Sequence, residues 1–137
     1  MQVLSTRLSD FELFADLSAE ELRELARSCD EMTARSGSTV IRQGQVGTQI
    51  YLMEEGSVSI YREQNGTVQP LVELHAPAVF GEMAIVNPER IRTASVKALS
   101  NLRLLGIPAN HFRSFLRDFP GLRNNFMQML TSRTPRK

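Results

Sequence analysis

The chain is poor in the features that cross-link a protein or anchor it in a membrane. Its 137 residues include one cysteine, Cys29, which excludes an intramolecular disulfide and an all-thiolate zinc site. The longest apolar runs are only a few residues, far short of the roughly 20 that span a bilayer. Residues 1–6 lack the basic start and the long apolar stretch of a secretory signal. We therefore expect a soluble protein of the reducing cytoplasm with no membrane span.

The chain also has little net charge and lacks several common catalytic motifs. Sixteen basic residues balance fifteen acidic ones, for a formal net charge of +1, which lacks the positive excess of a nucleic-acid-binding domain. Residues 119–137 carry four basic residues and no acidic one. No Gly-x-Ser-x-Gly, Walker lysine or Cys/His arrangement occurs. His75 and His111 lie too far apart to suggest the clustered ligands of a metal site. We expect no enzyme, no metal and no bound nucleic acid.

The length predicts one domain over residues 1–137, and its first zone, residues 10–32, is predicted to be helical. Ser18 and Glu21 have the spacing of a capping box, and apolar residues follow at helical spacing, with Cys29 completing the stripe. The apolar residues of 11–17 are expected to form a short turn that acts as a hydrophobic plug.

The second zone, residues 33–107, is predicted to be β. Short apolar runs are separated by turn signals, and Asn65-Gly66 between two such runs predicts a hairpin. Many short strands at this spacing are typical of a sandwich or barrel. The third zone, residues 108–133, is predicted to be helical with a break at 118–121, and residues 134–137 to be a frayed tail.

One irregular segment, residues 80–96, interrupts the β zone. A glycine leads into a predicted one-turn helix, which Asn87-Pro88 ends, and Arg90 and Arg92 follow. Amides at a helix N-terminus carry partial positive charge, and an arginine beside them adds a charge-assisted clamp. This pattern favours a phosphate site, although glycine before a helix is common.

The sequence of this segment resembles the phosphate-binding cassette of the cyclic-nucleotide-binding domain family, which includes the catabolite activator protein, regulatory subunits of cyclic-AMP-dependent protein kinase and nucleotide-gated channels. The two halves are Phe80-Gly81-Glu82-Met83-Ala84-Ile85 and Ile91-Arg92-Thr93-Ala94-Ser95-Val96. Residues 13–18, 37–47 and 50–58 resemble further family blocks in the same order. The resemblance covers nearly the whole chain.

The resemblance implies a mainly β fold with flanking helices, a jelly roll of the cyclic-nucleotide-binding type, holding cAMP or cGMP. The ligand-binding residues that it implies are Gly81, Glu82, Met83, Ala84, Arg92, Thr93, Ala94 and Ser95.

The family pattern also assigns individual roles. Gly81 makes the turn beneath the ribose, and Glu82 accepts from the ribose 2′-hydroxyl. Arg92 clamps an exocyclic phosphate oxygen, and the amides of Ala84 and Ala94 donate to the phosphate. The Thr93 hydroxyl can meet a guanine amino group, and Ser95 closes the cassette.

The sequence departs from the family pattern at several positions, none of which is expected to contact the charged groups of the ligand. Ile91 replaces the usual proline before the arginine, Pro77 replaces a frequent glycine, and Thr48-Gln49 replace Asp-Ser. Arg92, not Arg90, fits the family's ending, so Arg90 is expected to be a solvated loop residue.

The sequence therefore predicts a regulatory module in which a cyclic nucleotide draws helices 108–118 and 121–132 over its base. Phe126, Met129 and Leu130 are the candidate lid residues, and a protein partner or a homodimer is expected to use the same helices. The alternative is a degenerate roll that binds no nucleotide and serves as an oligomerisation or interaction module, with Glu82 and Arg92 as a structural ion pair. A DNA-binding regulator is disfavoured, because about 20 residues follow Asp118.

Overall fold

The computed structural model describes residues 3–87 and 89–133. The chain divides into a helical unit, Met1–Ser28 with His111–Lys137, and a β unit, Cys29–Asn110. Pro88 and the expected tail at 134–137 lie outside the described residues, and one domain over residues 1–137 stays a prediction.

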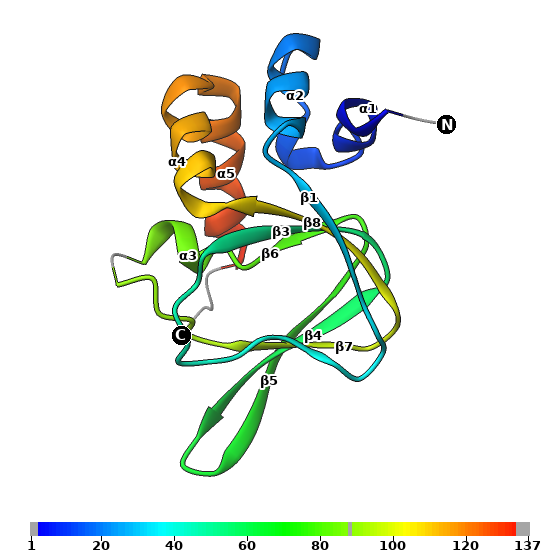
Figure 1. Cartoon of the computed structure of the whole chain (residues 1–137). Helices are drawn as coiled ribbons and strands as arrows, with labels where there is room; N and C mark the ends of the chain where they lie inside the picture. The colour runs from blue at the N-terminus through cyan, green and yellow to red at the C-terminus, as the bar shows by residue number, and fades with distance from the viewer. Residues whose placement is uncertain (1–2, 88, 134–137) are drawn as a thin grey trace. The chain divides into compact units, whose positions relative to one another are not determined.

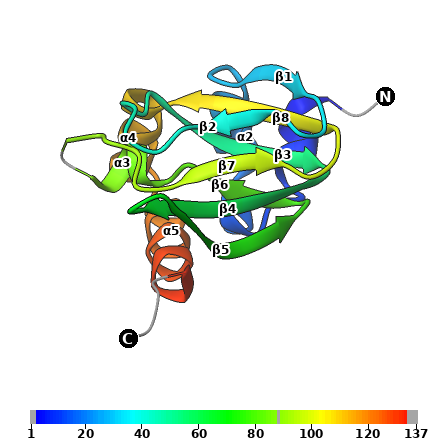
Figure 2. The ribbon, with the colours of Figure 1, turned by 90° about the horizontal axis from the view of Figure 1, so that it is seen from below.

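The described residues of the β unit form two four-stranded antiparallel sheets (Figures 1 and 2). One sheet has the order β1-β8-β3-β6 and the other β2-β7-β4-β5. The strands are β1 (Asp30–Ala34), β2 (Thr39–Ile41), β3 (Gln49–Glu55), β4 (Ser57–Gln64), β5 (Thr67–His75), β6 (Ala78–Phe80), β7 (Ser95–Ala98) and β8 (Leu102–Pro108). A single-turn helix, α3 (Met83–Val86), lies between β6 and β7.

Apolar side chains from both sheets form the core of the β unit. The rings of Tyr51 and Phe80 stack with centroids 5.2 Å apart, and both side chains belong to one buried cluster with Val58 and Val96 of the other sheet. Apolar residues on alternate positions of a strand share one face, so each sheet contributes one apolar face to this cluster. The predicted mainly β roll is confirmed.

The predicted Asn65-Gly66 turn joins β4 to β5. Both residues have positive φ, 54° and 78°, as a type I′ turn requires. β5 is the edge strand of its sheet, which accommodates Pro70, a residue with no N–H to donate.

The N-terminal helical zone differs from the prediction in three respects. The helical zone expected over 10–32 ends earlier, because residues 30–32 belong to β1 and pair with β8. Cys29, expected on a helix stripe, lies beyond the end of α2 (Ala19–Ala26). The short helix α1 (Leu4–Leu8) precedes the predicted helical zone and was missed, whereas β6 lies within the predicted β zone.

The helical unit contains α1, the 3₁₀ turn η1 (Glu12–Phe14), α2, most of α4 (Ala109–Asp118) and α5 (Pro120–Arg133). The predicted capping box of α2 is confirmed: the Ser18 amide donates to Glu21 Oε1 at 2.9 Å, and the Glu21 amide donates to Ser18 Oγ at 3.1 Å. Leu13 and Phe14 of η1 are buried, as the plug prediction requires. Among the described residues, none of the helices combines the length and apolar character needed to cross a bilayer.

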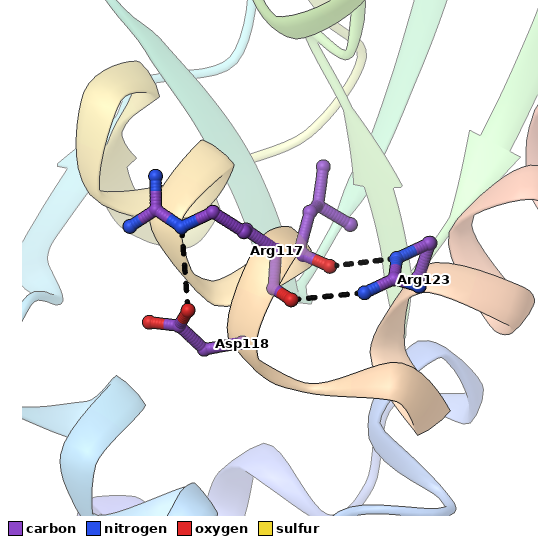
Figure 3. Close-up of polar contacts among 4 residues, drawn as sticks. Arg117, Asp118 and Arg123 are labelled. Atoms are coloured by element: carbon purple, nitrogen blue, oxygen red, sulfur yellow. Dashed lines mark hydrogen bonds and ion pairs between the residues drawn. The ribbon is translucent and has the colours of Figure 1, made fainter.

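The predicted break between the two C-terminal helices is confirmed at Phe119. Arg123, in the first turns of α5, donates from Nε to the Leu116 carbonyl at 3.0 Å and from Nη2 to the Arg117 carbonyl at 2.9 Å (Figure 3). Carbonyls in the last turn of a helix lack partners within that helix. One guanidinium therefore caps the end of α4 from the next helix.

Candidate ligand-binding site

The eight predicted ligand-binding residues all lie in the β unit, between β6 and the start of β7. Gly81 has φ of +84°, a conformation that glycine adopts without strain. A Cβ at this position would lie 3.1 Å from both Arg92 Nη1 and Tyr51 Cδ2. The chain thus turns sharply against the arginine at the position where the prediction places the ribose.

Arg92 is the most deeply buried charged side chain of this segment, with 5% of its surface exposed. Its Nη1 donates to the Gly81 carbonyl at 2.8 Å, and its Nη2 donates to the Gln49 carbonyl at 2.9 Å. The two bonds fix the guanidinium between the cassette (residues 80–96) and β3. Each terminal nitrogen of a guanidinium carries two N–H groups, so each keeps a second donor after these bonds.

Burial lowers the pKa of Arg92, because a charged guanidinium loses water when it is enclosed. Tyr51 and Glu82 act in the opposite direction and raise that pKa through their electrostatic interaction with the guanidinium. An anion placed beside Arg92 would compensate the same cost of burial. The electrostatics of the site therefore suit a negatively charged ligand.

Arg90 has a different environment from Arg92. Its side chain is exposed, its φ is +59°, and its carbonyl accepts from the Gly47 amide at 2.6 Å. The structure thus gives the buried position to Arg92 and the loop position to Arg90.

Gly47 and Gln49 are two neighbours of Arg92 that sequence reasoning did not assign to the site. A Cβ at Gly47 would lie 2.5 Å from Arg92 Nε and 2.6 Å from Arg92 Cζ, so only a glycine leaves room for the guanidinium. Gln49 contributes its main-chain carbonyl. A main-chain acceptor leaves no signal in the side-chain pattern.

The first half of the cassette forms a tight turn into α3. Ala84 is buried, and its amide donates to the Gly81 carbonyl at 3.2 Å. Glu82 and Met83 are half-buried. The Gly81 carbonyl therefore accepts from both Ala84 and Arg92, which ties the turn to the arginine.

The second half of the cassette is held by β4 and by the residues that follow β2. The Ser95 hydroxyl accepts from the Gln43 amide at 2.9 Å, and the Thr93 carbonyl accepts from Arg62 Nε at 3.2 Å. Thr93 and Ala94 are half-buried, while Ser95 is buried. A hydroxyl that accepts one bond still has its own hydrogen to donate.

The three candidate lid residues lie on α5 in the helical unit. Phe126 is buried, and its ring packs against Phe112 with centroids 5.3 Å apart. Met129 and Leu130 are half-buried. Their role as a lid stays a prediction. Within residues 3–87 and 89–133, no group of three His, Cys, Asp or Glu side chains is placed to hold a metal ion.

Comparison with known proteins gives a family match. The sequence profile described as "Cyclic nucleotide-binding domain" matches residues 31–119, a range that includes the whole cassette.

The curated relatives include a kinase regulatory subunit, a protein kinase and a channel. The cAMP-dependent protein kinase regulatory subunit of Mucor circinelloides f. lusitanicus is 30% identical over 109 residues, covering 80% of this chain and 25% of that protein. The cGMP-dependent protein kinase egl-4 of Caenorhabditis elegans is 33% identical over 103 residues, covering 75% and 13%. The cyclic nucleotide-gated potassium channel mll3241 of Mesorhizobium japonicum is 31% identical over 121 residues, covering 88% and 32%. The chain thus spans a third or less of the length of each.

Solved structures share the fold. The Thermus thermophilus catabolite activator protein is 27% identical with a TM-score of 0.78, covering 88% of this chain and 57% of that one. The sensor domain of the transcriptional regulator DNR from Pseudomonas aeruginosa is 25% identical with a TM-score of 0.83, covering 94% and 87%. The regulatory subunit of a cAMP-independent protein kinase A from Trypanosoma brucei, 22% identical, has a TM-score of 0.80 and covers 95% and 46%.

Proposed function

Because the chain belongs to the cyclic nucleotide-binding domain family, we propose that it binds cAMP or cGMP through residues 80–96 and acts as a regulatory module. The observation that carries this proposal is the buried Arg92 guanidinium, fixed by the carbonyls of Gly81 and Gln49. A buried cation whose hydrogen bonds run to neutral carbonyls is a favourable place for a phosphate, since charge-assisted bonds to phosphate are strong.

The remaining cassette residues take the roles that the family pattern assigns. Arg92 donates to an exocyclic phosphate oxygen, Glu82 accepts from the ribose 2′-hydroxyl, and Gly81 lets the ribose approach the backbone. The amides of Ala84 and Ala94 donate to the phosphate. For Ala84 this requires its 3.2 Å bond to the Gly81 carbonyl to loosen or to be shared.

The regulatory step is a change in the arrangement of α4 and α5. A ligand shifts a conformational equilibrium only when it binds the two states with different affinity. Apolar contact between the base and α5, through Phe126, Met129 or Leu130, would supply that difference. The output would pass to a protein partner or a second copy of the chain through the same helices, in the cytoplasm.

The test is a calorimetric titration of the protein with cAMP and with cGMP, using a matched pair of variants. Arg92→Gln and Arg90→Gln remove the same charge two residues apart, one from the buried position and one from the loop. We expect Arg92→Gln to weaken binding by about 30-fold to several thousand-fold, which corresponds to roughly 2–5 kcal/mol for a truncated buried charge contact. Arg90→Gln should bind within about threefold of wild type, which is under about 0.7 kcal/mol. Equal affinities of the two variants would overturn the assignment of Arg92.

A second candidate function, a roll that binds no nucleotide, is favoured by one specific observation. Both terminal nitrogens of Arg92 already donate to carbonyls of the β unit, so the residue can act as a structural clamp. Folded wild-type protein, free of co-purified ligand, that gives no heat with either nucleotide would support this candidate. Interaction through the C-terminal helices would then be the function to test.

A further inference from the structure

The part of the cassette around Arg92, residues 90–92, is hydrogen-bonded through its main chain to one neighbouring segment, residues 43–47, which we call the strap. The Gly47 amide donates to the Arg90 carbonyl at 2.6 Å, and the Arg92 amide donates to the Gln45 carbonyl at 2.8 Å. The Gly44 amide donates to the Arg92 carbonyl, also at 2.8 Å. Both main-chain groups of Arg92 are therefore held by the strap.

The strap is itself anchored to β4 through one side chain, that of Gln43. Its Nε2 donates to the Glu63 carbonyl at 3.2 Å, and its Oε1 accepts from the Glu63 amide at 2.8 Å. A carboxamide supplies donor and acceptor groups in one plane, as a peptide group does. The Gln43 side chain thus pairs with the Glu63 main chain in the way that a neighbouring strand would.

The Gln43 main chain completes the connection to the cassette. Its amide donates to Ser95 Oγ at 2.9 Å, so a continuous series of bonds runs from Glu63 through Gln43 to Ser95. Arg62, the residue before Glu63, bonds the Thr93 carbonyl in parallel. The end of β4 is consequently linked both to the strap and to the cassette residues that follow Arg92.

We infer that Gln43 is a positioning residue for the ligand site, which sets the affinity for the cyclic nucleotide by fixing the strap and, through it, Arg92. This inference rests on the proposed function. No ligand contact is assigned to Gln43. Its effect would come from holding the guanidinium in register with the phosphate, because displacement of a binding group by about 1 Å can remove most of its contribution.

Replacing the Gln43 carboxamide by a carboxylate tests this inference with a small chemical change. In Gln43→Glu the carboxylate can still accept from the Glu63 amide, but it cannot donate, and it faces the Glu63 carbonyl with a negative charge. Gln45→Glu makes the same chemical change two residues along the same strap, where the side chain is exposed and the residue bonds Arg92 through its main chain. It is therefore a matched control for charge and location.

The experiment measures three quantities on wild type and both variants: affinity for cAMP and cGMP by calorimetry, hydrogen exchange of the Gly44 and Arg92 amides without ligand, and melting temperature. We expect Gln43→Glu to bind about 3- to 10-fold more weakly, because binding must then also order the loosened strap, at a cost of about one partly solvated hydrogen bond. We expect faster exchange at Gly44 and Arg92 and little change in melting temperature, because the anchor lies at the surface. Gln45→Glu should match wild type in all three.

The outcomes separate the inference from the proposed function. Unchanged exchange at Arg92 in Gln43→Glu would overturn the inference, since the anchor would not hold the strap. Faster exchange with unchanged affinity would overturn it as well, since the strap would not matter to the ligand. Wild-type protein that binds neither nucleotide would overturn the proposed function, whatever Gln43→Glu does to exchange.

Discussion

Gly47→Ala adds one carbon atom beside Arg92 and tests whether the position of this guanidinium determines ligand affinity. The added Cβ would lie 2.5 Å from Arg92 Nε, 2.6 Å from Arg92 Cζ and 2.9 Å from Ala84 Cβ. Ordinary contact between such atoms begins at about 3.4 Å, so the guanidinium or the backbone must move by nearly 1 Å. Gly47 does not have φ in the left-handed region, so the substitution tests contact and not backbone strain.

The size of the effect follows from the bonds that such a movement disrupts. Arg92 holds the carbonyls of Gly81 and Gln49 at 2.8 and 2.9 Å, and a shift of about 1 Å would lengthen one or both beyond hydrogen-bonding range. Overpacking of this kind costs about 1–3 kcal/mol of stability. We expect affinity for the cyclic nucleotide to fall by about 10- to 100-fold, or roughly 1.4–2.7 kcal/mol, because the clamp is displaced from the phosphate.

Calorimetric titration and thermal unfolding of Gly47→Ala should be compared with Gly37→Ala. Gly37 has φ of +89°, and a Cβ added there would have nothing within 4 Å, so alanine costs about 1 kcal/mol of stability through backbone conformation alone. The control should lose stability and keep its affinity. If Gly47→Ala bound as tightly as Gly37→Ala, the close approach of Gly47 to Arg92 would not determine binding and the reasoning would be refuted.

Two further predictions concern the helical unit, and both are read by denaturant unfolding followed by circular dichroism. Ser18→Ala removes the acceptor of the Glu21 amide and should destabilise the protein by about 1 kcal/mol; no loss would mean that the capping box contributes nothing. Arg123→Ala leaves the Leu116 and Arg117 carbonyls to water and should cost about 0.5–1 kcal/mol. Arg117→Ala, which removes only an exposed ion pair, should cost less than about 0.5 kcal/mol, and a larger loss for Arg117→Ala than for Arg123→Ala would contradict the assignment of the cap.

Much of the fold could be predicted because local signals agreed with the tertiary structure. The capping box at Ser18 and the positive-φ turn at Asn65-Gly66 depend on residues within a few positions of each other, so the sequence carries them directly. The prediction for residues 30–32 was wrong because only the pairing of β1 with β8, more than seventy residues away, defines it as a strand. The alternation within β1 is too short to outweigh the preceding helical pattern.

The candidate site shows the same contrast between features that neighbouring residues determine and features that distant contacts determine. The structure brings the two halves of the cassette together at Gly81 and Arg92, and the sequence could indicate this because the cassette is one continuous motif. The ligand contacts of these residues stay predictions. Gln49 and Gly47 could not be predicted, since one contributes a main-chain carbonyl and the other only the absence of a side chain. The hydrogen bonds of Gln43 could not be predicted either, because its partner, Glu63, lies twenty residues away and is engaged through the main chain.

The position of Arg92 has an energetic consequence for binding. Burial lowers its pKa, so the folded β unit holds a cation that would be better solvated outside it. The carbonyls of Gly81 and Gln49 supply partial negative charge, and Glu82 adds an electrostatic attraction, but burial has the largest effect on this pKa. A bound phosphate would add negative charge beside the guanidinium, and part of the binding free energy would then come from relief of this unfavourable burial. The Arg92 guanidinium joins the cassette to β3, and the Arg92 main chain joins the cassette to the strap. The stabilisation that a bound phosphate provides would therefore extend to the cassette, β3 and the strap. Ligand binding would therefore be expected to slow hydrogen exchange throughout residues 43–49 and 80–96, and not only at the amides that touch the phosphate.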